Sequence, residues 1–261
     1  MKRTVIYLLV ALSLFNFSYA QQLVEADPAS QGFSAEKLNR IDHVMKEYIE
    51  QGKMNGAAYL VARNGKIIYY RSVGYDEREI NKPLKRDAIF RIASQTKAIT
   101  SVAVMMLYEE GKFLLDDPVS KYIHSFKNPR VLDKFNEKDT TYTTIPAKRE
   151  VTIRDLLTHT SGIGYAQIGS KESNAIYAKN NITAGLGSGR KSLGEDIQLL
   201  GSLPLMHNPG EKFTYGLNTD VLGYLVEVIS GTALDKFFRS RIFEPLGMMD
   251  TYFNIPAEKQ D

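Results

Sequence analysis

The chain has 261 residues, of which 43% are hydrophobic and 24% charged, a composition typical of a globular protein with one large domain or two small ones. Two of its 33 basic residues lie within the first three positions, and the remainder nearly balance the 30 acidic residues. This charge balance does not favour binding to nucleic acid or to an anionic membrane. The sequence contains no cysteine, which excludes disulfide bonds and lipid attachment at cysteine.

Residues 1–20 have the pattern of a secretory signal peptide. Lys2 and Arg3 provide a positive start, a short apolar stretch follows, and Ser18-Tyr-Ala20 provides a small-residue cleavage site. The apolar stretch is short for a membrane span, and no later stretch is apolar enough to cross a bilayer. We therefore expect a periplasmic or secreted protein whose mature part is one domain, residues 21–261, with no stable membrane span after removal of the signal.

The N-terminal part of the predicted mature domain shows first a helical and then a strand pattern. Ser34 has the position of an N-cap for an amphipathic helix that ends near Gly52. Two apolar, β-prone runs at 56–63 and 66–75 flank Asn64-Gly65, and this arrangement is the strongest short-range signal of a β-hairpin.

The segment 90–100, with sequence FRIASQTKAIT, predicts the start of a long buried helix. Ser94 is placed to cap this helix, and Lys97 lies three residues later, one turn away on the same face. A lysine can accept a proton from a serine hydroxyl when the lysine pKa is lowered, and we expect burial and the positive helix end to lower the pKa of Lys97. Apolar side chains at helical spacing define the expected buried face: Ala98, Ile99, Val102, Ala103, Met106 and Leu107.

The spacing of Ser94 and Lys97 is by itself weakly specific, because Ser34 with Lys37 and Ser188 with Lys191 also fit S-x-x-K. Ser34 is better explained as a helix cap, and Ser188 lies in a Gly-rich segment. Only Ser94 begins a helix with apolar residues on both sides of the pair. On spacing alone, a capping serine with an unrelated lysine is the better interpretation.

The C-terminal half predicts helices separated by irregular segments. The polar, aperiodic stretches at 126–148 and 164–190 predict surface loops. Thr152 has the position of an N-cap, and an amphipathic helix ends at Gly231. A two-stranded ribbon is marginal alone, so a chain with one predicted hairpin has an incomplete sheet.

Several common site signatures are absent from the sequence. The lipase elbow G-x-S-x-G does not occur, the four histidines show no metal-ligand spacing, and no dinucleotide-binding or phosphate-binding glycine pattern is present. We therefore expect neither a metal nor a cofactor. The four histidines are better explained as surface or hydrogen-bonded structural residues, although His159 remains open as a base to a serine.

Tyr215 is the remaining candidate, because it lies between a Pro-Gly turn and an apolar helix, where a side chain can project into a cleft. A phenol beside a lysine has its phenolate form favoured and can transfer a proton during acyl transfer. From the residues alone, a tyrosine packed at a helix start is slightly favoured over a catalytic one.

Four segments in the same order resemble the serine β-lactamase-related superfamily, most closely family VIII carboxylesterases and other class C β-lactamase-like hydrolases. They are 90–97 (FRIASQTK), 156–162 (LLTHTSG), 215–223 (YGLNTDVLG) and 244–248 (EPLGM). The resemblance runs from about Gly32 to Phe253. It implies a β-lactamase/transpeptidase-like α/β fold, with an antiparallel sheet flanked by helices plus a helical region, and a sheet that is incomplete in this chain.

The resemblance also implies an exported serine hydrolase that works through an acyl-enzyme. Ser94 would be the nucleophile and its backbone N–H an oxyanion donor, Lys97 the adjacent proton acceptor, and Tyr215 the group that passes the proton to the leaving group. The role of base is assigned to Lys97 and Tyr215 jointly. The substrate would be a small ester or amide.

Two departures from the β-lactamase pattern shape this expectation. The residue two after Tyr215 is Leu217, where β-lactamases and penicillin-binding relatives carry asparagine, so ester hydrolysis is favoured. A β-lactamase, a D-alanyl carboxypeptidase, a penicillin-binding protein and a non-catalytic binding relative are the alternatives. The third motif of the family, Lys-Thr-Gly or His-x-Gly, is absent, which predicts that the C-terminal part of the domain is missing.

Overall fold

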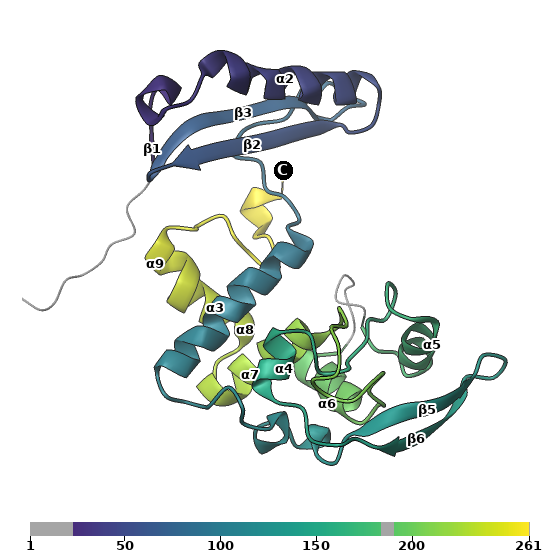
Figure 1. The fold of residues 1–261 in the computed structure, drawn as a ribbon. Coiled ribbons are helices and arrows are strands. Elements are labelled where there is room, and N and C mark those ends of the chain that lie inside the picture. Colours follow the sequence, from purple (N-terminus) through teal and green to yellow (C-terminus); the bar gives the residue numbers. More distant parts are fainter. Residues whose placement is uncertain (1–22, 184–190, 261) are drawn as a thin grey trace, which may run out of the picture. The chain divides into compact units, whose positions relative to one another are not determined.

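The computed structural model describes residues 23–183 and 191–260 (Figure 1). The predicted signal peptide and the Gly-rich segment that contains Ser188 lie outside these residues. The described chain forms two compact units. The first comprises residues 23–91 together with Pro245–Thr251, and the second comprises Ile92–Glu244 together with residues 252–260.

The first unit is a small sheet with helix α2 (Ala35–Glu50) on one face (Figure 1). The Ser34 hydroxyl accepts a hydrogen bond from the Lys37 N–H at 3.3 Å, which confirms the predicted N-cap. The helix ends next to Gly52, whose positive φ of 70° suits glycine. The buried core between helix and sheet contains Leu38, Ile68 and Tyr69.

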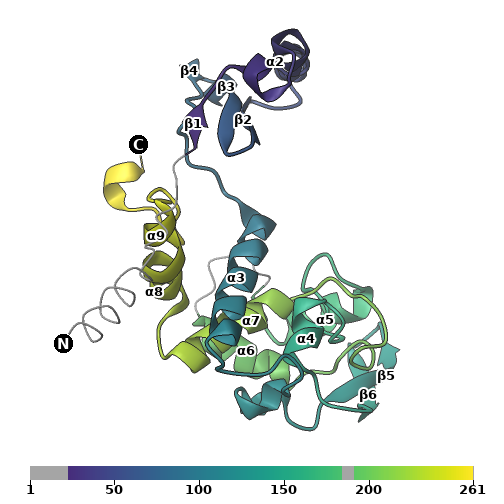
Figure 2. The same cartoon turned by 60° about the vertical axis from the view of Figure 1, so that its left-hand side comes forward.

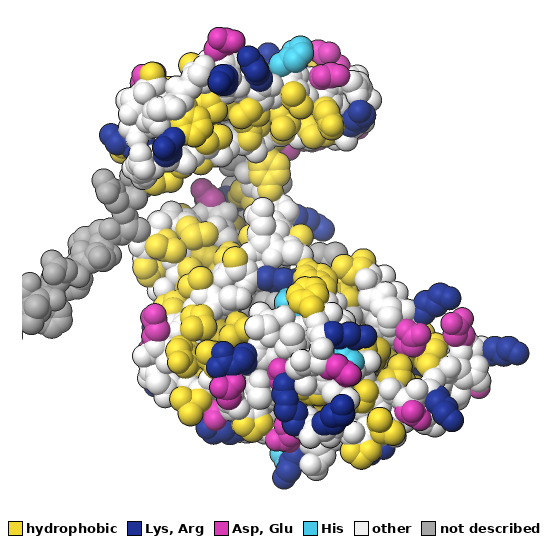
Figure 3. Space-filling model, viewed as in Figure 1, with side chains coloured by type: hydrophobic (Ala, Val, Ile, Leu, Met, Phe, Trp, Pro, Cys, Tyr) yellow, Lys and Arg dark blue, Asp and Glu magenta, His cyan; other side chains and the backbone are white. Residues whose placement is uncertain are grey.

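The predicted hairpin is confirmed in the sheet of this unit. Strands β2 (Gly56–Arg63) and β3 (Lys66–Glu77) are antiparallel, and both turn residues, Asn64 and Gly65, have positive φ. Strand β1 (Val24–Glu25) pairs in parallel with β3, and β4 (Lys82–Pro83) pairs antiparallel with it, so the order is β1-β3-β2. Figure 3 shows hydrophobic side chains gathered over this sheet, where Leu60 is 46% exposed.

The core of the second unit is formed by α3 (Thr96–Glu109), α4 (Ile153–Leu157) and α7 (Asn218–Ser230), with α3 and α4 both in contact with α7 (Figure 2). The buried face of α3 differs from the predicted one. Ala103 and Leu107 are buried as expected, but Val102 is 50% exposed, and Thr100 and Val104 complete the buried face instead. The predicted α7 is confirmed, with its buried apolar side chains and its end at a left-handed Gly231.

The prediction of a loop at 126–148 is wrong, because this segment forms the antiparallel hairpin β5 (Arg130–Asn136) and β6 (Thr141–Pro146). Its strands are largely polar and exposed, so they lack the alternating hydrophobicity that marks a half-buried strand. Two backbone hydrogen bonds to Leu205 hold the hairpin in place. The Leu132 N–H donates to the Leu205 carbonyl at 2.8 Å, and the Leu205 N–H donates to the Arg130 carbonyl at 2.8 Å. β-Branched threonines suit this pleated, hydrogen-bonded setting.

The prediction of an irregular segment at 164–190 is also wrong in part, because α5 (Lys171–Lys179) lies within it. The Ser170 hydroxyl accepts from the Ser173 N–H at 3.2 Å, and the helix buries Ile176 and Tyr177. The unit also contains α6 (Leu193–Gly201), α8 (Leu234–Phe238) and a π-helical turn at Arg239–Phe243. In the part of the chain that the structure describes, no helix combines the length and the apolar character needed to cross a membrane.

Candidate active site

Ser94 lies in a short 3-10 turn, Ala93–Gln95, directly before α3. The preceding Ala93 has a φ of 41°, in the left-handed region that residues other than glycine rarely adopt. Such strain of the backbone is found most often at functional sites. The predicted role of Ser94 as the helix cap is wrong. The residue before α3 is Gln95 and the residue before the 3-10 turn is Ile92, and neither makes a capping hydrogen bond with its side chain. The Ser94 side chain is exposed and bonds elsewhere.

The structure brings the three predicted site residues together. The Ser94 hydroxyl is 2.9 Å from the Tyr215 phenol oxygen, and the Lys97 ammonium lies 5.0 Å from the centre of the Tyr215 ring. Lys97 occupies the second position of α3, and Lys97 and Tyr215 are both half-buried. The group is therefore less enclosed than a buried helix start predicts, and Ser94 is its most exposed member.

The surroundings of Tyr215 favour its ionised form. The hydrogen bond with Ser94 lowers the pKa of the phenol, and the charge and hydrogen bonding of Lys97 lower it further, whereas burial of the ring opposes them. The net effect is a pKa below the ordinary value. A phenol with a lowered pKa has more of its phenolate form near neutral pH, and the phenolate is the form that can remove the proton of a serine.

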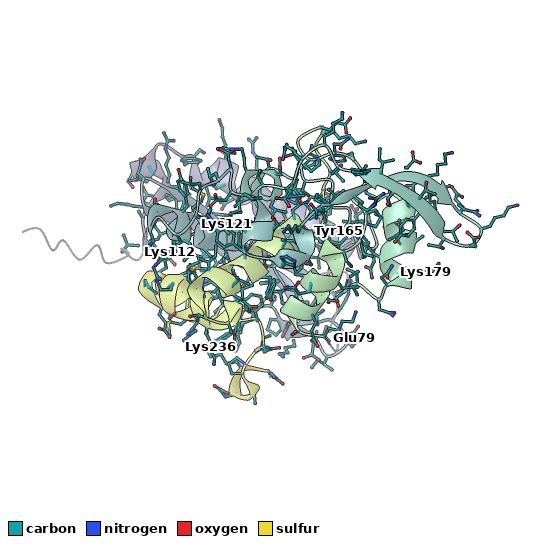
Figure 4. The ribbon with its side chains drawn as sticks, turned by 90° about the horizontal axis from the view of Figure 1, so that it is seen from below. Glu79, Lys112, Lys121, Tyr165, Lys179 and Lys236 are labelled. Atoms are coloured by element: carbon teal, nitrogen blue, oxygen red, sulfur yellow. The ribbon has the colours of Figure 1, made fainter. Side chains whose placement is uncertain are left out.

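Two other rings stack on the ring of Tyr215. The imidazole of His159 stacks on it with centroids 5.1 Å apart and planes at 21°, and the buried ring of Tyr165 stacks at 5.7 Å and 4°. Both come from the segment that follows α4, and Tyr165 is labelled in Figure 4. Stacked contacts of this kind fix the plane of a ring. Sequence reasoning missed Tyr165, and the only signal nearby was the LLTHTSG segment that precedes it.

His159 does not serve as a base to Ser94 in this arrangement, because the Ser94 hydroxyl bonds to Tyr215. The His159 Nδ1 accepts instead from the side-chain amide of Asn218 at 3.0 Å, so these partners place its proton on Nε2. Burial lowers the pKa of His159, and the nearby positive charge of Lys97 lowers it further. The imidazole is therefore held neutral at neutral pH.

Asp220, in the first turn of α7, is a second charged group near Lys97 that sequence reasoning missed. Burial raises the pKa of its carboxyl, while the positive charge of Lys97 acts in the opposite direction. The site thus combines a cation, a phenol and a carboxyl. Among the described residues, no three histidine, aspartate or glutamate side chains form a group that would hold a metal ion.

Close backbone packing fixes the chain around Tyr215. The Leu217 N–H donates to the Gly164 carbonyl at 3.0 Å, and a Cβ atom on Gly216 would lie 2.1 Å from the Ile163 carbonyl oxygen. Only glycine fits at position 216, so the segment that contains Tyr215 can pack directly against the backbone of Ile163 and Gly164. Leu217, two residues after Tyr215, is 2% exposed and belongs to the core.

Proteins of one family are similar to this chain in sequence and in fold. The model of the Beta-lactamase family matches residues 41–261. The chain is 35% identical over 235 residues to esterase EstB of Burkholderia gladioli, and 29% identical over 265 residues to a putative D-alanyl-D-alanine carboxypeptidase of Escherichia coli O157:H7. These alignments cover 90% and 97% of the chain.

A solved structure of EstCE1, described as a hydrolase with promiscuous acyltransferase activity, matches with a TM-score of 0.69 and 31% identity over 80% of the chain. The chain spans 56% of the length of each of the two relatives and 51% of that structure's chain. The family model matches most of the chain, and the chain therefore belongs to the Beta-lactamase family.

Proposed function

We propose that this chain carries the nucleophile and the proton-transfer groups of an exported serine hydrolase that cleaves small esters through an acyl-enzyme on Ser94. The observation that carries the proposal is the contact of the Ser94 hydroxyl with the Tyr215 phenol, beside the Lys97 ammonium. A serine hydroxyl needs an adjacent base to become a nucleophile, and this contact provides one. The signal-like pattern of residues 1–20 supports export.

In the first half of the proposed reaction, the Ser94 oxygen attacks the ester carbonyl carbon as its proton passes to Tyr215 or Lys97. The new C–O bond forms while the carbonyl opens to an oxyanion, which the Ser94 N–H would stabilise. Collapse of this intermediate breaks the bond to the alcohol oxygen, and the alcohol leaves with the transferred proton. Water then attacks the acylated Ser94 in the same way, which releases the acid and restores the serine.

An ester substrate is favoured over an amide by two observations. An esterase and a hydrolase with promiscuous acyltransferase activity match this chain at 35% and 31% identity. The position two residues after Tyr215 holds Leu217, which is buried in the core, where β-lactamases and penicillin-binding relatives carry asparagine. The match to a putative D-alanyl-D-alanine carboxypeptidase, at 29% identity, makes amide hydrolysis the second candidate.

The test is labelling of the full chain by a fluorescent fluorophosphonate, which reacts with activated serines. Wild type should be labelled, and Ser94→Ala should not. Ser101→Ala, a half-buried serine on the same helix α3, is the matched control and should be labelled like wild type. Turnover of p-nitrophenyl butyrate without turnover of nitrocefin would favour the esterase. A folded wild type that takes no label, or a labelled Ser94→Ala, would overturn the proposal.

A further inference from the structure

His159 contacts the chain on both sides of Tyr215 as well as the Tyr215 ring itself. Its carbonyl accepts from the Thr214 N–H at 2.7 Å, and its Nδ1 accepts from the Gly216 N–H at 3.4 Å. Its imidazole stacks on the phenol ring between these two bonds. One residue therefore fixes the backbone before Tyr215, the backbone after it and the plane of its ring.

A buried network fixes His159 in turn. The Asn218 amide N–H donates to His159 Nδ1 at 3.0 Å, while the Asn218 carbonyl oxygen accepts from the Ser161 hydroxyl. The Ser161 oxygen then accepts from the Ile163 N–H at 3.0 Å. Asn218 and Ser161 are both fully buried, so an unpaired polar group would be costly in either position. This series of hydrogen bonds fixes the orientation of the His159 imidazole.

This network requires Nδ1 to be an acceptor, because two N–H groups point at it. The charged group that acts on the imidazole is Lys97 on α3, and the rings that contact it are those of Tyr215 and Phe213. A proton on Nδ1 would face both N–H donors and add a positive charge near Lys97. Protonation of His159 would therefore break the bonds that hold the segment around Tyr215.

We propose that His159 is a positioning residue that holds the Tyr215 phenol against Ser94, and that it does so only as the neutral imidazole with its proton on Nε2. The inference rests on the proposed function for its effect on catalysis, but the placement of the phenol is measurable without any turnover. His159 touches neither the serine nor its leaving group in this scheme. His159 contributes to the proposed reaction only by holding the Tyr215 phenol in position.

The experiment combines NMR with acylation kinetics on the full chain. In wild type labelled with ¹⁵N-histidine, His159 should show an unprotonated Nδ1 and a protonated Nε2 at neutral pH. With ¹³Cζ-tyrosine, the Tyr215 signal, assigned by its loss in Tyr215→Phe, should titrate below the ordinary value near 10. In His159→Phe, which keeps a ring but loses the acceptor, this titration should move back toward that value, because the phenol loses its contact with Ser94.

The acylation rate with p-nitrophenyl butyrate should fall about 10- to 100-fold in His159→Phe with little change in KM, the size of loss expected from a misplaced catalytic group. His159→Gln, whose amide oxygen can accept at the position of Nδ1, should recover part of this loss. The matched control is His207→Gln. His207 is more deeply buried than His159 and bonds to Asn208 and to Thr214, the neighbour of Tyr215, but the ring that stacks on the phenol is that of His159. The His207→Gln variant should leave the Tyr215 titration unchanged.

A proton on Nδ1 of His159 in wild type would overturn the inference, and so would a Tyr215 titration that is the same in His159→Phe and wild type. If His159→Phe does not fold, Asn218→Ala removes the side-chain donor to Nδ1 and should shift the Tyr215 titration in the same direction. If wild type takes no fluorophosphonate, the proposed function fails while the two titrations still decide the position of the phenol.

Discussion

The Ser94 hydroxyl lies 2.9 Å from the Tyr215 phenol, although the two residues are 121 positions apart in the sequence. Each partner is placed by local backbone features that tolerate little change. A left-handed Ala93 turns the chain into the serine, and Gly216 allows the segment after the tyrosine to lie against the Ile163 carbonyl. Both residues belong to the same compact unit, so the contact is a property of that unit alone.

Removal of the phenol oxygen alone should abolish most of the acylation while the fold remains. Tyr215→Phe keeps the ring that stacks on His159 and on Tyr165, but it loses the atom that bonds to Ser94. We expect a loss of about 10²- to 10⁴-fold in the acylation rate, the usual contribution of a general base. Stopped-flow burst kinetics measure this rate, and an unchanged circular dichroism spectrum is the control. A Tyr215→Phe variant that acylates at the wild-type rate would remove the phenol from the mechanism.

Substitutions of Lys97 should separate its charge from its ability to accept a proton. Lys97→Met removes both, so the pKa of Tyr215 should rise and the pH–rate profile should move to higher pH. Lys97→Arg keeps a positive charge that does not titrate in this range.

If the lysine acts through its charge on the phenol, Lys97→Arg should retain part of the activity that Lys97→Met loses. If the lysine itself takes the proton, the two variants should be equally inactive. The pH dependence of the acylation rate of all three proteins distinguishes these outcomes. Equal pH profiles for wild type and Lys97→Met would contradict any role for the ammonium.

The ion pair of Arg149 with Asp155 should stabilise the second unit in a pH-dependent way. Burial alone would raise the pKa of Asp155, but its hydrogen bonds with Arg149 and Thr152 outweigh burial and lower it. The Arg149 guanidinium is 44% exposed and the Asp155 carboxylate only 6%, so Arg149→Met leaves a buried carboxylate without its cation. We expect a loss of about 1–3 kcal/mol in the free energy of unfolding at pH 7, below the range for fully buried pairs.

The sign of this pH dependence follows from the lowered pKa. The stabilisation is fully present above the unfolded-state pKa of an aspartate, about 3.9, and is lost as the pH falls through the lower folded-state value. The difference between wild type and Arg149→Met should therefore shrink below about pH 4. Urea unfolding at several pH values measures it. Arg154→Met, which breaks the exposed pair with Asp116, is the control and should have little effect.

The turn of the first hairpin should depend on glycine at one position only. Gly65 has a φ of 69°, and open space surrounds the position of a Cβ atom there. Gly65→Ala should therefore cost about 1 kcal/mol from backbone conformation alone. Asn64→Gly is the control, because glycine also accepts the positive φ at position 64. Thermal unfolding measures both, and a Gly65→Ala variant as stable as wild type would contradict the assigned turn.

Local signals in the sequence predicted the elements that they describe directly. The Ser34 cap, the Asn64-Gly65 turn and the glycine end of α7 each depend on neighbouring residues, and all three are present. The β5–β6 hairpin was missed because its strands are polar, and it is held by bonds to the distant Leu205. Helix α6 was missed although Ser192 and Glu195 form a capping box at its start.

The candidate site divides in the same way. Ser94, Lys97 and Tyr215 were named from motifs in the sequence, and the structure brings them together. The stacking of His159 and Tyr165 on the phenol depends on contacts across about fifty residues, which no local pattern records. The prediction that Ser94 caps the helix was wrong for a related reason. In the folded chain its hydroxyl bonds to the phenol of Tyr215, which is distant in the sequence, and not to the end of the helix.

The unusual backbone at Ala93 limits which residues can precede Ser94. Valine, isoleucine and threonine tolerate this conformation poorly, whereas glycine, alanine and asparagine carry a smaller penalty. Searches for similar serine hydrolases should therefore weigh the size and branching of the side chain before the serine, in addition to the lysine three residues after it. Such a filter would separate serines in the backbone setting of Ser94 from the many chance occurrences of S-x-x-K.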